Sequence, residues 1–121
     1  MATPNLINVD TITPVVAVGA VTTSRADIVD VTDEYCAKIN SLIIANIDGT
    51  NAADITVEVS TDNGSSYIKI ANTISVPADS SLSLIGKDNG FYLDETDLLA
   101  VTASANSDLT YLVSYELMKD A

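Results

Sequence analysis

The chain has 121 residues, a length that suits one domain with a single hydrophobic core. Its 17 acidic and 5 basic residues give a formal net charge of −12. Such acidity disfavours contact with nucleic-acid phosphates and with an anionic membrane surface, so we expect neither as a partner. Because a high net charge also keeps a concentrated protein soluble, acidity by itself indicates no specific function.

The composition favours β-structure. Hydrophobic residues make up 47% of the chain, but it has one Phe, five Tyr and no Trp, so Ile, Val, Leu and Ala must fill most of the core. Residues of this kind suit pleated sheets. The N-terminus lacks the basic and apolar regions of a secretory signal, and apolar runs such as "PVVAVGAV" are too short to span a bilayer.

The first segment is the hardest to assign. Within residues 1–24, "MATPNLINVDTIT" has few apolar anchors and "PVVAVGAVTTS" alternates poorly. We therefore expect either an extended N-terminal arm or a first strand there, with residues 25–121 forming the β-sandwich domain.

Two strands are predicted next. Residues 26–34 form a short, polar strand, and "AKINSLIIANID" predicts a strand buried on both faces. The expected faces of the second strand are Ile39, Ile43, Ala45 and Ile47 on one side, with Leu42 and Ile44 on the other.

The clearest periodicity lies in residues 54–60. Ile55, Val57 and Val59 alternate with polar residues, which predicts a strand with one buried face. The pair Asn63-Gly64 then supplies the positive φ angles of a hairpin turn, and residues 68–76 form the returning strand.

The remaining chain repeats this alternation of strand and turn. Leu82 and Leu84 mark a strand, and Asn89-Gly90 predicts a second Asn-Gly turn. Two further strands are expected over residues 98–105 and 109–117. In the last one, the residues that share a face are Leu109, Tyr111, Val113, Tyr115 and Leu117.

The predicted fold class is therefore all-β: a single-domain antiparallel β-sandwich of about eight short strands, jelly-roll or immunoglobulin-like. "DEYCAK", the one candidate helical turn, is too short to form a stable helix. Open sheets have unpaired edges that a protein must cover or use, so assembly through an edge is physically open to this chain.

A calcium site is one candidate, because acidic residues surround the glycines of "NIDGTNAADITVEVSTDNGSSY". An EF-hand loop needs Gly at position six and Glu at position twelve. A loop starting at Asp48 has Ala53 and Val59 there, and starts at Asp62 or Asp88 fail in the same way. A looser site made by Asp94, Glu95 and Asp97 stays open, although acidic turns commonly cap their own backbone amides.

Catalytic chemistry finds no support in the residue types. Cys36 is the only cysteine and the chain has no His, so it has neither a disulfide framework, nor a base for a thiol nucleophile, nor a zinc ligand set. The five glycines form no phosphate-binding motif. We therefore predict no enzyme activity, and no catalytic, cofactor-binding or metal-binding residue.

A carbohydrate- or receptor-binding module is a weaker alternative. Tyr67 and Tyr92 lie near loops rich in Asp and Asn, which suits a sugar-binding rim. Such platforms usually rely on Trp, which this chain lacks.

The order of three stretches is more specific: "INSLIIANIDGTNAADITVEV", "YIKIANTISVPADSSLSL" and "FYLDETDLLAVTASANSDLTYLVSYEL". Over residues 38–117 this succession resembles small β-rich virion proteins of tailed bacteriophages, in the class of capsid decoration (cement) proteins. The segment before Lys38 departs from that pattern, and no catalytic residue is carried over.

The resemblance implies a non-enzymatic protein made in the host cytoplasm, which binds the major capsid protein on the outside of an icosahedral shell and stabilises it. It also implies homo-oligomers, with a trimer favoured. Tail, fibre and head-to-tail connector proteins share related folds, so a role of that kind is the alternative. Many weak symmetric contacts would let such a small subunit brace a shell.

Overall fold

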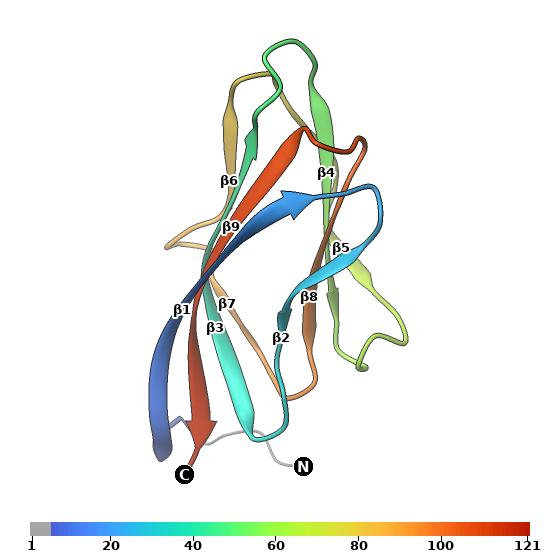
Figure 1. The fold of residues 1–121 in the computed structure, drawn as a ribbon. Coiled ribbons are helices and arrows are strands. Elements are labelled where there is room, and N and C mark those ends of the chain that lie inside the picture. Colours follow the sequence, from blue (N-terminus) through green and yellow to red (C-terminus); the bar gives the residue numbers. More distant parts are fainter. Residues whose placement is uncertain (1–5) are drawn as a thin grey trace.

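The protein is described by a computed structural model that covers residues 6–121. These residues form nine β-strands and no helix, arranged as two antiparallel sheets that face each other (Figure 1). The predicted all-β sandwich is confirmed. Three strands have 12 or 13 residues each, and the last one extends three residues beyond the predicted range of 109–117.

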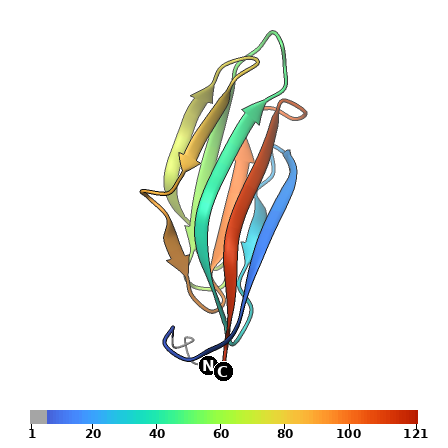
Figure 2. The ribbon, with the colours of Figure 1, turned by 90° about the vertical axis from the view of Figure 1, so that its left-hand side faces the viewer.

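The first sheet, which we call sheet A, has the order β1-β9-β3-β6, and β7 also pairs with β3. Its strands are β1 (Val9–Val21), β9 (Leu109–Asp120), β3 (Tyr35–Asn46), β6 (Ser81–Ile85) and β7 (Phe91–Leu93). Figure 2 views this sheet face on, with β1 at its right-hand edge.

The second sheet, sheet B, has the order β2-β8-β4-β5. Its strands are β2 (Ala26–Asp30), β8 (Leu98–Ala103), β4 (Ala53–Ser60) and β5 (Ile68–Val76). Asn63 and Gly64, with φ angles of 58° and 89°, turn the chain between β4 and β5, as the sequence predicts.

The strand pairs define the topology. β1 pairs with β9, β2 with β8, β3 with β6, and β4 with β5, so a long two-stranded ribbon folds over on itself. This is the arrangement of a jelly roll. The first and last strands therefore lie side by side along their whole length (Figures 1 and 2).

The core lies between the sheets. Its fully buried side chains come from both layers and are almost all aliphatic, as the composition predicts: Val21, Val29, Val31, Ile39, Leu42, Ile44, Ile55, Val57, Val76, Leu93, Leu99 and Leu109. Burying a Val, Leu or Ile side chain contributes about 1.5–3 kcal/mol, so this layer supplies the main stabilisation.

The two-sided burial predicted for residues 37–48 is wrong. A bulge at Asn40 shifts the register of β3 against β9, since Ile39 pairs with Tyr115 and Ser41 with Ser114. The bulge places Ile39 on the same inner face as Leu42 and Ile44. Ile43 is consequently 38% exposed on the outer face, and Ile47 lies beyond the strand at 62% exposure.

The second Asn-Gly turn also differs from the prediction. The turn closes between Gly86 and Asn89, where Asn89 N donates to Gly86 O at 3.3 Å. β6 and β7 on either side both pair with β3, so they form no hairpin with each other. Gly90 is needed for space: a Cβ there would lie 2.6 Å from the carbonyl oxygen of Ile39.

Candidate interaction surfaces

The acidic residues singled out from the sequence do not converge. Asp48 precedes β4 and Asp62 follows it, so a strand of about 26 Å separates them. Each carboxylate caps its own turn: Asp48 Oδ1 accepts from Thr50 N at 2.8 Å, and Asp62 Oδ1 accepts from Ser66 N at 2.9 Å.

These hydrogen bonds set the protonation behaviour of the two turns. The backbone N–H of Thr50 is the main cause that lowers the pKa of Asp48, and the Ser66 hydroxyl is the main cause that lowers the pKa of Asp62. Burial, together with the nearby charge of Asp48, raises the pKa of Asp108. Asp48 and Asp62 act as turn caps, as local hydrogen bonding by Asp predicts.

The loop carboxylates near β8 also accept hydrogen bonds from backbone N–H groups. Asp97 Oδ2 accepts from Asp94 N at 2.8 Å, and Glu95 Oε2 accepts from Glu34 N at 2.7 Å. Burial is the main cause that raises the pKa of Asp97. Across residues 6–121, no group of three or more His, Cys, Asp or Glu side chains is placed to hold a metal ion.

Cys36 lies in β3 with 3% of its surface exposed. Burial raises the pKa of its thiol, which keeps it in the unreactive protonated form.

Tyr67 and Tyr92 have different surroundings. The Tyr67 hydroxyl donates to Asp27 Oδ1 at 2.9 Å, and the Arg25 guanidinium carbon lies 4.0 Å from the centre of its ring. Tyr92 is 53% exposed on β7, with Lys38 Nζ 5.9 Å from its ring centre. The Tyr67 ring is therefore already covered by a cation, which leaves Tyr92 as the exposed aromatic of the pair.

The most unusual surface is the outer face of sheet A. Three adjacent rows of paired residues cross the sheet there, and none of their residues is charged, although 18% of the chain is. We call this surface the uncharged face; it comprises Val16, Val18, Ala20, Ser41, Ile43, Ala45, Ser81, Ser83, Thr110, Leu112 and Ser114.

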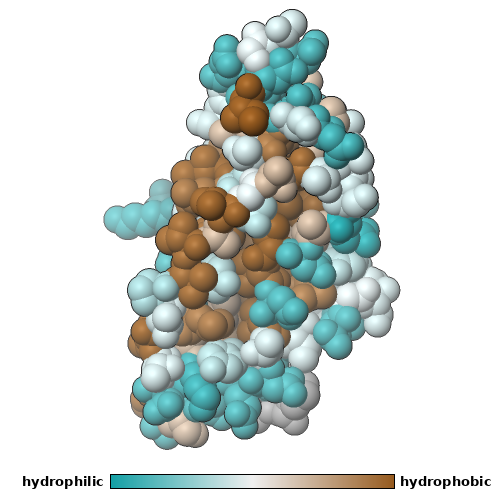
Figure 3. Space-filling model, in the orientation of Figure 1, coloured by the Kyte–Doolittle hydropathy of each residue, from teal (hydrophilic) through white to brown (hydrophobic). Residues whose placement is uncertain are grey.

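Apolar side chains are prominent on the uncharged face. Val16 is 64% and Val18 68% exposed, and Ile43 lies in the same row as Val18. A shallow hollow of about 500 Å³ lies between Val18, Ile43 and Leu112. Figure 3, in which sheet A is seen edge-on, shows apolar residues from the left side to the middle of the molecule, while both ends are hydrophilic. Exposed apolar side chains that gather on one face commonly mark an interaction site.

Charged residues bound the uncharged face on one side. The next row pairs Pro14 with Glu116 and Glu116 with Lys38, and Asn40 Nδ2 donates to Glu116 Oε1 at 3.2 Å.

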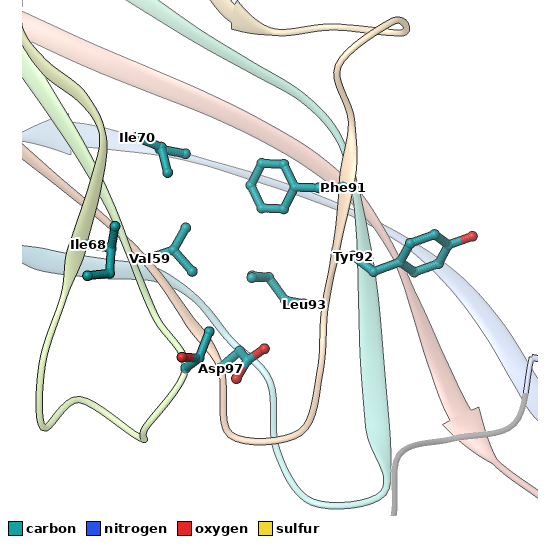
Figure 4. A pocket seen from close by; sticks show the side chains of 8 residues that line it. Val59, Ile68, Ile70, Phe91, Tyr92, Leu93 and Asp97 are labelled. Atoms are coloured by element: carbon teal, nitrogen blue, oxygen red, sulfur yellow. The ribbon is translucent and has the colours of Figure 1, made fainter.

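A second apolar surface opens between the sheets. Ile68 and Ile70 on β5 face Phe91 and Leu93 on β7 across a cleft of about 300 Å³, with Asp97 at one end (Figure 4). Tyr92 points away from this cleft. The cleft forms because β7 has only three residues, so the edge of sheet A does not cover β5.

Sequence reasoning missed both surfaces. The uncharged face had a visible signal, since the stretch from Thr11 to Ser24 carries no charge in a strongly acidic chain. The cleft had no such signal in the sequence, because it depends on how far the edge of sheet A at β7 extends over β5 of sheet B.

No protein-family model matches the chain, and no curated protein sequence matches it. A solved structure of the disulfide-linked pili of Bacillus endospore appendages is similar, with 15% identity and a TM-score of 0.55 over 92% of this chain and 88% of that one. This similarity shows a shared fold.

Two weaker structural similarities were found. A pentameric capsid protein from metagenomic phage sequences has 17% identity and a TM-score of 0.38 over 95% of this chain and 67% of that one. The tumour-necrosis-factor protein Eiger of S. frugiperda has 17% identity and a TM-score of 0.34 over 77% and 64% of the two chains. Neither similarity is close enough to support an argument about function. Within residues 6–121, there is no helix of the length and apolar character needed to cross a membrane.

Proposed function

We propose that this protein is a non-enzymatic structural subunit of a bacteriophage virion, which decorates the outside of the icosahedral shell and stabilises it. The observation that carries the proposal is the uncharged face of sheet A. A protein of net charge −12 repels acidic surfaces over most of its own surface, and this face is where it can approach another protein closely.

The described residues support a structural role in two further ways. Asp48 and Asp62 cap turns, Glu58 forms an ion pair, and the single cysteine is buried. The jelly roll also has long strands packed on one aliphatic core, which suits a structural subunit.

Particle composition provides the first test. A decoration protein should approach the copy number of the major shell subunit in purified virions, as measured by quantitative mass spectrometry. A tail, fibre or connector protein would be far scarcer. Absence of the protein from purified particles would refute any role as a virion component.

A binding experiment tests the surface itself. Ile43→Asp places a carboxylate on the uncharged face, where the native side chain is 38% exposed. Ile74→Asp on β5 is the matched control, with 40% exposure on the other sheet. In co-sedimentation with shells that lack the protein, we expect Ile43→Asp to lose binding and Ile74→Asp to retain it. Equal loss from both variants would contradict a role for this face.

A further inference from the structure

Strand β1 is an edge strand whose protection is confined to its first six residues, where Asp10 lies at a register irregularity and Pro14 follows. It lies at the end of sheet A, and the described residues provide ladder hydrogen bonds to it from β9 alone. Its other side presents a row of unpaired backbone groups over 13 residues. Natural proteins normally blunt such an edge with charges, bulges or a short strand. Between Thr11 and Val21, β1 has no charged residue.

The other edges of the molecule do not match β1. On the far side of sheet A, β6 has five residues and β7 three, and the turn that contains Lys87 interrupts them. In sheet B, β2 has five residues, including Asp27 and Asp30, and β5 carries Lys69 and irregular register. The edge strand that matches β1 in length and in its long uncharged stretch is β1 of a second copy, which makes it the best pairing partner.

Charge also fixes the direction of such a pair. Asp10 is the one charged residue of β1 and lies near its start. Parallel strands in register would place the two Asp10 side chains beside each other. Antiparallel strands place each Asp10 beside the uncharged end of the other strand, about 35 Å from its counterpart. Like charges placed directly opposite destabilise a strand pair, so the antiparallel arrangement is favoured.

We propose that β1 pairs antiparallel with β1 of a second copy about a two-fold axis, which joins the two A sheets into one continuous sheet. The contact is isologous, because the same strand serves both partners. A two-fold axis perpendicular to the sheet keeps the two uncharged faces on the same side, where they form one larger apolar surface. This inference concerns the free protein, and it stands whether or not the protein is a virion component.

Pro14 modifies the pair without preventing it. Proline has no N–H, so it is compatible with an edge strand where its nitrogen faces away from the neighbouring strand. Pro14 therefore removes one donor per copy from the new ladder. Alternate residues of an antiparallel strand face each neighbour, so Val16, Val18 and Ala20 share the outward orientation of Pro14 and keep their N–H donors for the new ladder.

Charge reversal at Val16 provides the test. Val16 lies next to the centre of β1 and is 64% exposed, so substitutions there should not disturb the core. In the two-fold pair, the two copies of residue 16 lie opposite or diagonal to each other, within about 8 Å. Like charges at that position repel, and opposite charges attract.

The measurement is mass in solution by sedimentation equilibrium. The wild type should sediment at twice its 12.7 kDa, and Val16→Lys and Val16→Asp alone should each sediment as a monomer. An equal mixture of the two variants should recover the dimer. Ile68→Lys on β5, where the native residue is 68% exposed, is the matched control and should remain dimeric.

Several results would overturn the inference. A monomeric wild type, a trimer, or an open-ended series of larger species would exclude the two-fold pair. A mixture of Val16→Lys and Val16→Asp that stays monomeric would show that residue 16 of one copy does not meet residue 16 of the other. Circular dichroism of each variant, with a thermal melt matching the wild type, ensures that a loss of dimer is not a loss of fold.

Discussion

Arg25 holds both carboxylate oxygens of Glu58: its Nε donates to Oε1 at 3.0 Å and its terminal NH2 group donates to Oε2 at 3.2 Å. The Glu58 side chain is 5% exposed, on a strand that the sequence predicts to be polar on this side. The same guanidinium stacks on Tyr67, so one cation joins β4 to the loop that leaves it. A planar fork suits this double role, and a lysine could not reproduce it.

Replacement of Arg25 by Ala should therefore lower the melting temperature by several degrees, because it leaves Glu58 buried with Lys69 Nζ at 3.7 Å as its one remaining cation. Arg25→Lys should recover only part of the loss. Lys69→Ala is the control and should have a much smaller effect, as expected for an exposed partner. Thermal melts of the three variants test this, and equal losses for Arg25→Ala and Lys69→Ala would contradict it.

Gly90→Ala should destabilise the fold by roughly 1–3 kcal/mol, because the added methyl group overlaps a backbone carbonyl that cannot move aside easily. Gly86→Ala in the same loop is the matched control, since a Cβ there meets no atom closer than 3.9 Å. Urea unfolding of both variants measures the difference. A stable Gly90→Ala variant would mean that β3 and the β6–β7 loop lie farther apart than described.

Asp97 and Asp62 should contribute to the pH dependence of stability with opposite signs. Burial raises the folded-state pKa of Asp97 above its ordinary 3.8, so the folded protein holds this proton more tightly than the unfolded chain. That contribution is complete below pH 3.8 and is lost as the pH rises through the raised pKa. Asp97→Asn should therefore gain stability relative to the wild type as the pH rises towards neutral.

Asp62 provides the opposite case. Its pKa is lowered from 3.8, chiefly by the Ser66 hydroxyl, so its contribution is present above pH 3.8 and is lost as the pH falls through the lowered pKa. Asp62→Asn should cost stability at neutral pH and little in acid. Chemical denaturation across this range measures both variants, and parallel pH profiles for the two would refute the assignment.

Cys36 should not react with a thiol reagent such as Ellman's reagent while the protein is folded, because its side chain is buried and its pKa is raised by that burial. Rapid and complete reaction should follow addition of denaturant. Reducing agent should accordingly leave the mass of any assembly of this chain unchanged, in contrast to the disulfide-linked pili with which it shares a fold. Rapid labelling under native conditions would contradict the placement of Cys36.

Local patterns in the sequence predicted the sandwich and several of its strands. Ile55 and Val57 are buried in β4 as expected, and Asn63-Gly64 turns the chain after it. The expected alternation ends at Val57, since Glu58 and Ser60 are buried and Val59 is only partly buried. The faces of β3 could not be predicted in the same way, because the bulge at Asn40 has no signature in the period of two that defines a regular strand.

The candidate surfaces were less accessible to prediction. The uncharged face gathers residues from β1, β3, β6 and β9, which only the jelly-roll topology brings together. Sequence alone left the segment before Ser24 open between an arm and a strand; in the structure, its residues from Val9 to Val21 are β1. The ion pair of Arg25 with Glu58 joins positions that no local pattern connects.

The pairing of β1 with β9 also has a kinetic consequence. It joins Val9 to Asp120, so sheet A can be completed only after nearly the whole described chain has left the ribosome. Pairings so distant in sequence slow folding, because a large loop must close before they contribute. Until β9 arrives, both edges of β1 lack a partner, and its uncharged part from Thr11 to Val21 is then the segment most vulnerable to aggregation between nascent chains.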